Sequence, residues 1–134
     1  MKHEPNIDSL LRNMEIADAF RSWLLAYGDI LVDAADFLGG PLWARRASAV
    51  VACARDAGDL HAYRRDITRL ARHLRLEIAD GLSRPEGARH AVLRFEDPRV
   101  DRAMFCANAI TRGARALEAL WLAGLTGCSE EGQS

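Results

Sequence analysis

The sequence predicts an all-α protein, built as a four-helix antiparallel bundle with a long first helix. Three observations predict this fold. Apolar residues recur every three or four positions through four long segments, which is the pattern of an amphipathic helix. Glycine, proline and aspartate stand between the segments, where they end one helix and cap the next. The connections are short, which favours antiparallel neighbours.

The first helix is expected over residues 7–38, where the apolar period has no break. Asn6 or Asp8 can cap its start, and the Gly-Gly-Pro run at 39–41 ends it. Gly28 is the weak point within this helix and predicts a kink.

A second apolar stripe runs along the first helix beside the core-facing one. Its members are Ile16, Trp23, Ile30 and Phe37, of which the last three are the candidate interface residues. The combined apolar face is too wide for a helix with one neighbour, and the other helices of a short bundle cover only part of it. A large uncovered apolar strip is unusual on a monomer. The stripe therefore predicts a contact with a second copy of the chain, most simply in a two-fold dimer, or with a partner protein.

The second and third helices follow from the residues at their borders. The second is expected over residues 42–57, behind a proline that suits a first helical turn, and Gly58 ends it. The third is expected over residues 59–80, with Asp59 as its cap and Gly81 at its close.

The fourth helix is expected over residues 98–125. Asp97 and Pro98 form a cap followed by proline at the first helical position. The stretch 88–96 fits a strand, a helix or a loop, and residues 126–134 are a polar tail.

Length and composition indicate a single helical-bundle domain. A chain of 134 residues suits one domain over residues 1–134, with an ordered core at about 7–125. With 49% hydrophobic and 28% charged residues, the chain does not have the composition of a disordered one. The longest stretch without a charge, 119–129, is far shorter than the roughly 18 residues of a membrane span, so no membrane partner is expected.

Cysteine and arginine usage indicate the compartment and the source. The cysteines Cys53, Cys106 and Cys128 are an odd number without metal-like spacing, which predicts reduced thiols in a cytoplasm. All but one of the 18 basic residues are arginine, which together with the alanine content is typical of a GC-rich bacterial genome.

Charge is sorted along the chain, although the formal net charge is only −1. Two triads with i, i+4, i+7 spacing stand out. The acidic column is Asp29, Asp33 and Asp36, and the arginine column is Arg65, Arg69 and Arg72. On a helix this spacing places three side chains on one face. Sorted charge of this kind indicates a contact within the fold or with a partner. The alternatives are a solvated face, a Mg²⁺ site for the carboxylates, and contact with phosphate or nucleic acid for the arginines.

One pattern allows the alternative that the protein is an RNA-cleaving enzyme. Arg55 and His61, and again Arg84 and His90, have the spacing Arg-x5-His. This spacing resembles the Arg–His signature of the HEPN ribonucleases, an all-α and often dimeric family. The resemblance implies that the arginine and histidine of two chains meet at a dimer seam.

A second pattern allows the alternative that the protein is a nucleotide-cleaving enzyme. Glu15 with Asp18, and Glu77 with Asp80, repeat the spacing acid-x-x-acid. The spacing resembles the pairs with which all-α nucleotide pyrophosphatases hold Mg²⁺ and a diphosphate. The resemblance implies a Mg²⁺-dependent reaction on a nucleotide.

The expected function is that of a non-catalytic protein-interaction module, a regulator, adaptor or small accessory subunit, acting through the apolar stripe and the charge columns. No catalytic residue, metal ligand or cofactor is assigned. The expected partner is a second copy of the chain, as a homodimer, or another protein, and the net charge of −1 disfavours nucleic acid. The alternative is a small all-α enzyme acting on RNA or a nucleotide.

Overall fold

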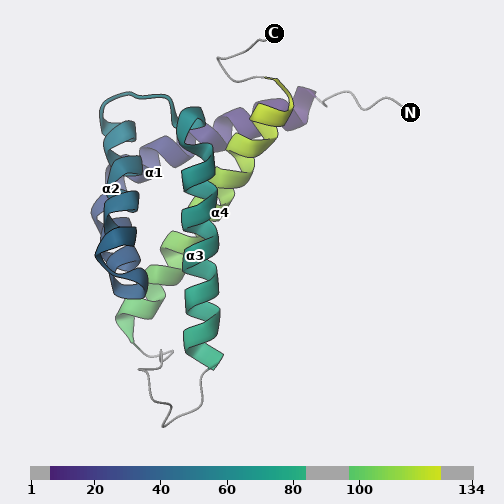
Figure 1. Ribbon diagram of the computed structural model, residues 1–134. Helices are drawn as coiled ribbons and strands as arrows, with labels where there is room; N and C mark the ends of the chain where they lie inside the picture. The colour runs from purple at the N-terminus through teal and green to yellow at the C-terminus, as the bar shows by residue number, and fades with distance from the viewer. Residues whose placement is uncertain (1–6, 84–96, 125–134) are drawn as a thin grey trace.

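The protein is all-helical, as the sequence predicts, and four α-helices pack against each other (Figure 1). The structure, a computed structural model, describes residues 7–83 and 97–124, and these contain no strand. The helices are α1 (Ile7–Gly39), α2 (Pro41–Arg55), the short 3₁₀-helix η1 (Leu60–Tyr63), α3 (Arg64–Ser83) and α4 (Pro98–Leu122).

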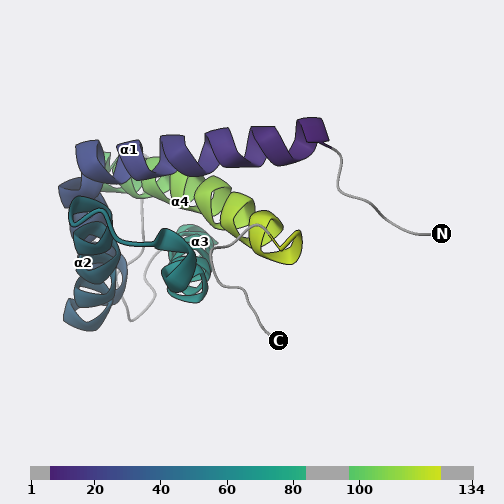
Figure 2. The ribbon, with the colours of Figure 1, turned by 90° about the horizontal axis from the view of Figure 1, so that it is seen from above.

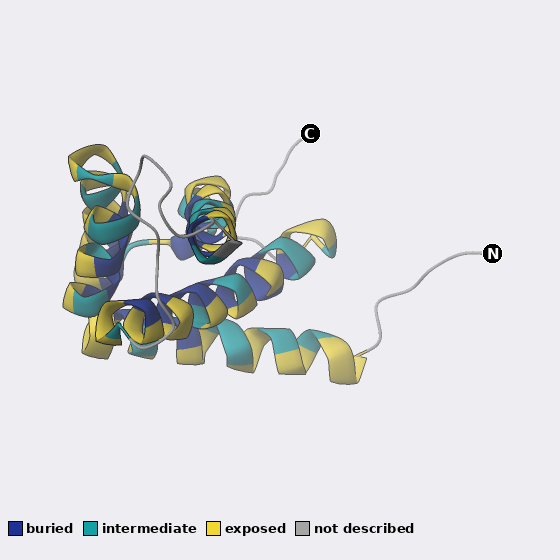
Figure 3. Ribbon diagram, turned by 90° about the horizontal axis from the view of Figure 1, so that it is seen from below, coloured by how far each residue is buried: buried dark blue, intermediate teal, exposed yellow. Residues whose placement is uncertain are grey.

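The helices form two layers. α1 and α4 lie side by side in one layer and run in opposite directions, while α2 and α3 lie across them in the other (Figures 1 and 2). α1 packs mainly against α4 and α2, and α3 packs mainly against α4. The sides of the helices that face one another are buried and the outer sides are exposed (Figure 3).

One contiguous hydrophobic core joins all four helices. Its largest fully buried side chains are Leu24, Leu31, Ile67, Leu70, Leu74, Ile110 and Leu117. No polar or charged residue of 7–83 or 97–124 is fully buried. Burial of apolar surface is therefore the force that holds the helices together.

The observed helices differ from the predicted ones at their ends. The segment expected as one helix over 59–80 begins as η1, in which the Ala62 N–H donates to the Asp59 carbonyl three residues back at 3.1 Å. The Asp59 carboxylate caps this turn by accepting a hydrogen bond from the His61 backbone N–H at 2.9 Å. Gly81 does not end α3, which continues to Ser83 with Gly81 buried inside it. α2 ends at Arg55, two residues earlier than expected.

The expected kink lies beside Gly28. The backbone leaves helical geometry at Tyr27 (φ −122°, ψ 16°). Gly28 is buried where α2 approaches, and a Cβ at this position would lie 2.6 Å from Cγ1 of Val51. The missing side chain therefore lets α1 and α2 pack closely just after the kink.

Several predictions fall on residues outside the described ranges. They concern the cap Asn6, the stretch 88–96, the tail 126–134, and the residues Arg84, His90 and Cys128. At the start of α4, the predicted cap is confirmed, since the Asp97 carboxylate accepts a hydrogen bond from the Arg99 backbone N–H at 2.9 Å.

Cys53 and Cys106 are buried and carry no disulfide. Burial raises the pKa of the Cys106 thiol to about 12, and burial also raises the pKa of Cys53. Both thiols therefore stay protonated at neutral pH and act as small apolar side chains. Among the described helices, none is both long and apolar enough to cross a membrane.

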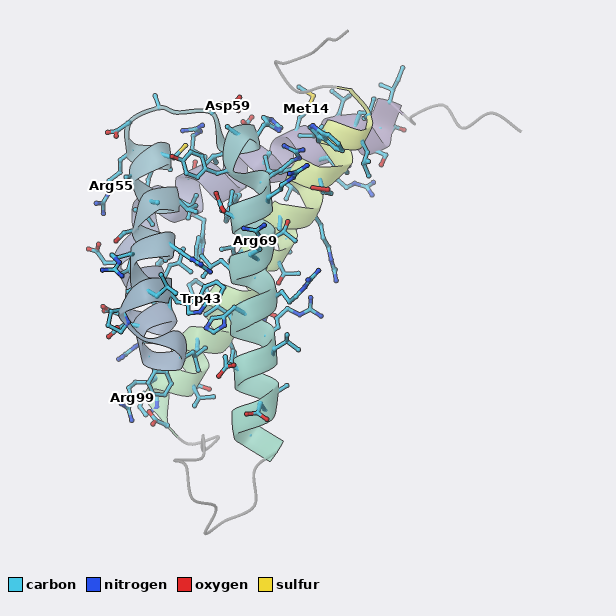
Figure 4. All side chains as sticks on the ribbon, viewed as in Figure 1. Met14, Trp43, Arg55, Asp59, Arg69 and Arg99 are labelled. Atoms are coloured by element: carbon cyan, nitrogen blue, oxygen red, sulfur yellow. The ribbon has the colours of Figure 1, made fainter. Side chains whose placement is uncertain are left out.

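A stacked ring pair joins α2 to α3. Trp43 reaches from α2 toward α3 (Figure 4), and its ring lies 3.8 Å from that of His73 at an interplanar angle of 2°. Nε2 of His73 is buried without a hydrogen-bond partner in the described part of the chain. Burial lowers the pKa of His73, nearby Arg46 lowers it further, and Glu77 opposes the shift.

This lowered pKa predicts a loss of stability in mild acid. The folded protein favours neutral His73, so the stabilisation is complete above the ordinary histidine pKa of about 6.5 and is lost as the pH falls through the lower folded-state pKa. Urea unfolding at pH 8 and at pH 5.5 measures the effect. The variant His73→Phe keeps a ring against Trp43 and should lose less stability between the two pH values. An equal loss in both proteins would contradict the assignment.

Candidate interaction surface

Aromatic rings from α1 and α4 meet where these two helices pack. The Trp23 ring lies 5.8 Å from that of Tyr27 and 5.7 Å from that of Phe105. Phe105 also meets Tyr27 edge-on at 5.2 Å, a favourable geometry for two rings. Tyr27 and Phe105 remain 41% and 45% exposed. The cluster therefore extends from the core to the molecular surface.

A groove of about 350 Å³ follows the α1–α4 contact on one side of these rings. Its lining is mainly apolar and is formed by Ile16, Ala19, Phe20, Trp23, Ala109 and Gly113. Glu15 and Arg112 supply its charged groups. This end of the surface therefore carries one charge of each sign.

A larger groove of about 630 Å³ lies on the other side of the rings. Ile30, Ala34 and Phe37 contribute its apolar side chains. The guanidinium of Arg99, at the start of α4 (Figure 4), lies 4.5 Å from the centroid of the Phe37 ring, a cation–π contact. The remaining charged lining residues are Asp33, Asp36 and Arg102.

The two grooves and the rings between them form one surface, which we call the seam surface. On α1 it includes Ile16, Trp23, Ile30 and Phe37, which recur every seven positions. On α4 they are Arg102, Phe105, Ala109 and Arg112, spaced three, four and three positions apart. Both spacings keep side chains on one face of a helix.

The predicted apolar stripe of α1 therefore lies on the seam surface, half-buried. α4 covers part of it, because Phe105 packs against Trp23 and Arg99 lies over Phe37. The more exposed rings are those of Tyr27 and Phe105, which the sequence analysis did not single out.

The predicted acidic column is divided between two grooves. Asp29 forms an ion pair with Arg55 of α2 at 3.3 Å, and both side chains are exposed, so the pair contributes little to stability. Asp33 lines both the groove beside Arg55, of about 440 Å³, and the larger groove of the seam surface. Asp36 lines the seam groove. The carboxylates thus share grooves with arginines of α2 and α4.

The predicted arginine column lies on α3, with Arg65, Arg69 and Arg72 all exposed. Arg69 (Figure 4) is 4.0 Å from the carboxylate of Asp66 on the same helix. Arg72 lines a further groove, between α3 and α4. The three side chains therefore have different surroundings.

Of the ribonuclease-like pattern, the structure describes Arg55 and His61, and no hydrogen bond or ion pair joins these two residues. Arg55 lies at the end of α2 and pairs with Asp29. His61 lies in η1, and its Nδ1 is buried without a hydrogen-bond partner among the described residues. Arg84 and His90 lie outside the described ranges.

The acidic pairs of the pyrophosphatase-like pattern stand on separate helices. Glu15 and Asp18 belong to α1, and Glu77 and Asp80 belong to α3. In residues 7–83 and 97–124, no three histidine, cysteine or acidic side chains gather in a way that could hold a metal ion.

A short sequence repeat, not among the predicted features, lies on α3 and α4. Residues 68–74 and 111–117 share the pattern Thr-Arg-x-Ala-Arg-x-Leu. One copy lies on α3 and the other on α4, and both line the groove between these helices. The repeat was therefore a signal in the sequence for this second surface.

Comparison of the chain with protein-family models, with curated proteins and with solved structures finds no match. Its function is therefore inferred from its own surfaces.

Proposed function

We propose that the protein is a non-catalytic interaction module, a cytoplasmic regulator, adaptor or small accessory subunit, that pairs with a second copy of itself through the seam surface. In this proposal the four helices form one antiparallel bundle, and the long α1 contributes to the interface together with α4. The observation that supports it most is the exposed pair of rings, Tyr27 and Phe105, at the centre of that surface.

Exposed rings between two grooves are suited to a protein contact. Interface cores are enriched in aromatic residues and arginine, and the seam surface contains both. Large rings contribute much apolar area for few rotatable bonds. Rings that remain exposed on one chain would gain this burial in a dimer.

The charges at the two ends of the seam surface favour a second copy as the partner. One end carries Glu15 and Arg112, and the other carries two acids and two arginines, Asp33, Asp36, Arg99 and Arg102. A two-fold axis through the rings would bring opposite ends of two copies together. Each end then meets charges of both signs, so Arg112 can face Asp33 or Asp36. Such pairing sets orientation more than affinity.

The distribution of carboxylates supports binding over catalysis. An enzyme that uses Mg²⁺ needs several carboxylates directed at one point. Here Asp29, Asp33 and Asp36 spread over two grooves that they share with arginines. No contact among the described residues favours the ribonuclease or pyrophosphatase alternative.

Replacing Phe105 with aspartate is expected to break the dimer. A central interface ring contributes about 2 kcal/mol or more to binding, so the dissociation constant should rise by roughly 30-fold or more. Size-exclusion chromatography with light scattering, over a range of protein concentrations, measures the mass of each species.

The matched control is Leu76→Asp. Leu76 is an apolar residue of α3 that is 61% exposed and lines neither groove of the seam surface. Its replacement introduces the same charge and should leave the dimer intact. A wild-type protein that stays monomeric at high micromolar concentration would overturn the proposal, as would equal dissociation of both variants.

A further inference from the structure

The groove between α3 and α4 is lined by two copies of one sequence pattern. The first, fourth, fifth and eighth positions of segments 68–75 and 111–118 form its lining. This i, i+3, i+4, i+7 spacing keeps the four side chains on one helix face. The polar lining residues are Thr68, Arg72, Arg75, Thr111, Arg115 and Glu118.

The small residues of the pattern bring the two helices together. Ala71 and Ala114, the fourth position of each copy, are buried at the helix contact. α3 and α4 run in opposite directions in Figure 1, so the two copies face each other in opposite senses. The arginines that follow each alanine therefore come from both helices onto one groove.

The groove carries an uncompensated positive charge. The side chains of Arg72, Arg75 and Arg115 form no hydrogen bond or ion pair within residues 7–83 and 97–124. The single acid, Glu118, is 3.8 Å from the guanidinium of Arg64. Arg64 is itself held over the Trp121 ring at 4.0 Å. The one carboxylate of the groove therefore already has a cationic partner outside it.

A polar group beside these arginines also lacks a partner. The hydroxyl oxygen of Thr111 is buried and has no hydrogen-bond partner in the described part of the chain. An unpaired buried hydroxyl is unfavourable. Threonine in a helix populates two χ1 rotamers, so a rotation can turn this hydroxyl into the groove as a donor.

We propose that this groove binds the phosphate or diphosphate group of a small phosphorylated ligand. Guanidinium groups match phosphate oxygens with paired hydrogen bonds. Three guanidinium groups from two helices suit an anion with several charged oxygens. A carboxylate, in contrast, is fully paired by a single guanidinium group. The groove volume of about 200 Å³ is below the roughly 300–1,000 Å³ of sites that enclose a whole organic ligand. Only the phosphate or diphosphate group of the ligand would lie in the groove, with the rest of the ligand outside it.

A nucleic-acid backbone is the less favoured source of phosphate. It needs a long basic track that neutralises many phosphates. The chain has a net charge of −1, and the neighbouring Arg69 lies 4.0 Å from the carboxylate of Asp66. The uncompensated charge is concentrated in a single groove that is separate from the seam surface, so this site does not depend on the proposed dimer.

Isothermal titration calorimetry with inorganic pyrophosphate tests the site. The wild-type chain should bind one pyrophosphate per chain, and Arg72→Gln and Arg115→Gln should each raise the dissociation constant about tenfold or more. Arg72→Lys keeps the charge but loses the paired geometry, so it should fall between wild type and Arg72→Gln. The control Arg45→Gln removes the same charge from an exposed position on α2, and its dissociation constant should stay within about twofold of the wild-type value.

Three results would overturn the proposal. The first is no binding of pyrophosphate at millimolar concentration. The second is equal weakening in Arg45→Gln and the two groove variants, which indicates general charge attraction. The third is tighter binding of a short RNA than of pyrophosphate with a steep salt dependence, which assigns the groove to nucleic acid. The groove arginines are exposed, so folding should persist in the variants, and circular dichroism of each checks this.

Discussion

Replacing Leu24 with alanine is expected to lower the free energy of unfolding by about 2–5 kcal/mol. Leu24 is fully buried in α1, within the core shared by all four helices. The shorter side chain loses apolar burial and leaves a cavity that the packed helices close only in part. Urea unfolding followed by circular dichroism measures the loss at a fixed protein concentration.

The neighbouring residue provides the matched control. Leu25 is 50% exposed on the same helix, so Leu25→Ala makes the same chemical change without opening a core cavity. Its cost should stay within about 0.5 kcal/mol, as is usual for surface changes. Similar losses for both variants would mean that α1 does not present these faces to the core and solvent as described.

Replacing Gly113 with valine is expected to destabilise the fold by roughly 1–3 kcal/mol. Gly113 lies on α4 against the ring of Phe20, and even one Cβ atom at this position would collide with ring carbons. The branched side chain must push α4 away from α1 or force the ring out of its rotamer. Thermal unfolding and urea unfolding both measure the result.

This change also affects the seam surface. Gly113 and Phe20 line the smaller groove, so separating α1 from α4 should weaken the dimer as well as the fold. The control Asn108→Val places the same valine at an exposed position of α4, where helix propensity alone predicts little change. A Gly113→Val variant as stable as wild type would contradict the close packing of α1 against α4 at this position.

Helix positions could be predicted because the signals for them are local. Asp97 caps α4 with a hydrogen bond two residues along the chain, and the Gly-Gly-Pro run at 39–41 separates α1 from α2. Helical hydrogen bonds join residues four apart, so neighbouring sequence contains the information they need. The misplaced start of the third helix shows the limit, since the Asp59 cap was expected but the 3₁₀ turn after it was not.

The candidate surfaces were predicted only in part. Trp23, Ile30 and Phe37 could be grouped from the sequence, because spacing within a helix determines which residues share a face. The meeting of Trp23 with Phe105 joins residues far apart in the sequence, and no spacing rule states which face of α4 packs there. The spacing places Asp29, Asp33 and Asp36 on one face of α1, but only the neighbours on α2 and α4 decide that they line two different grooves.

The sequence by itself determined the helical class, the approximate helix limits and the faces on which charge and apolar residues gather, because each depends on contacts within a few residues. Only the tertiary structure decided which faces meet. It placed Tyr27 and Phe105 together at an exposed seam, and it set Arg72 and Arg115 on one groove. These pairings depend on the fit of whole helix surfaces, with Gly113 and the buried alanines setting how closely the helices approach, and such fit is a property of the packed chain.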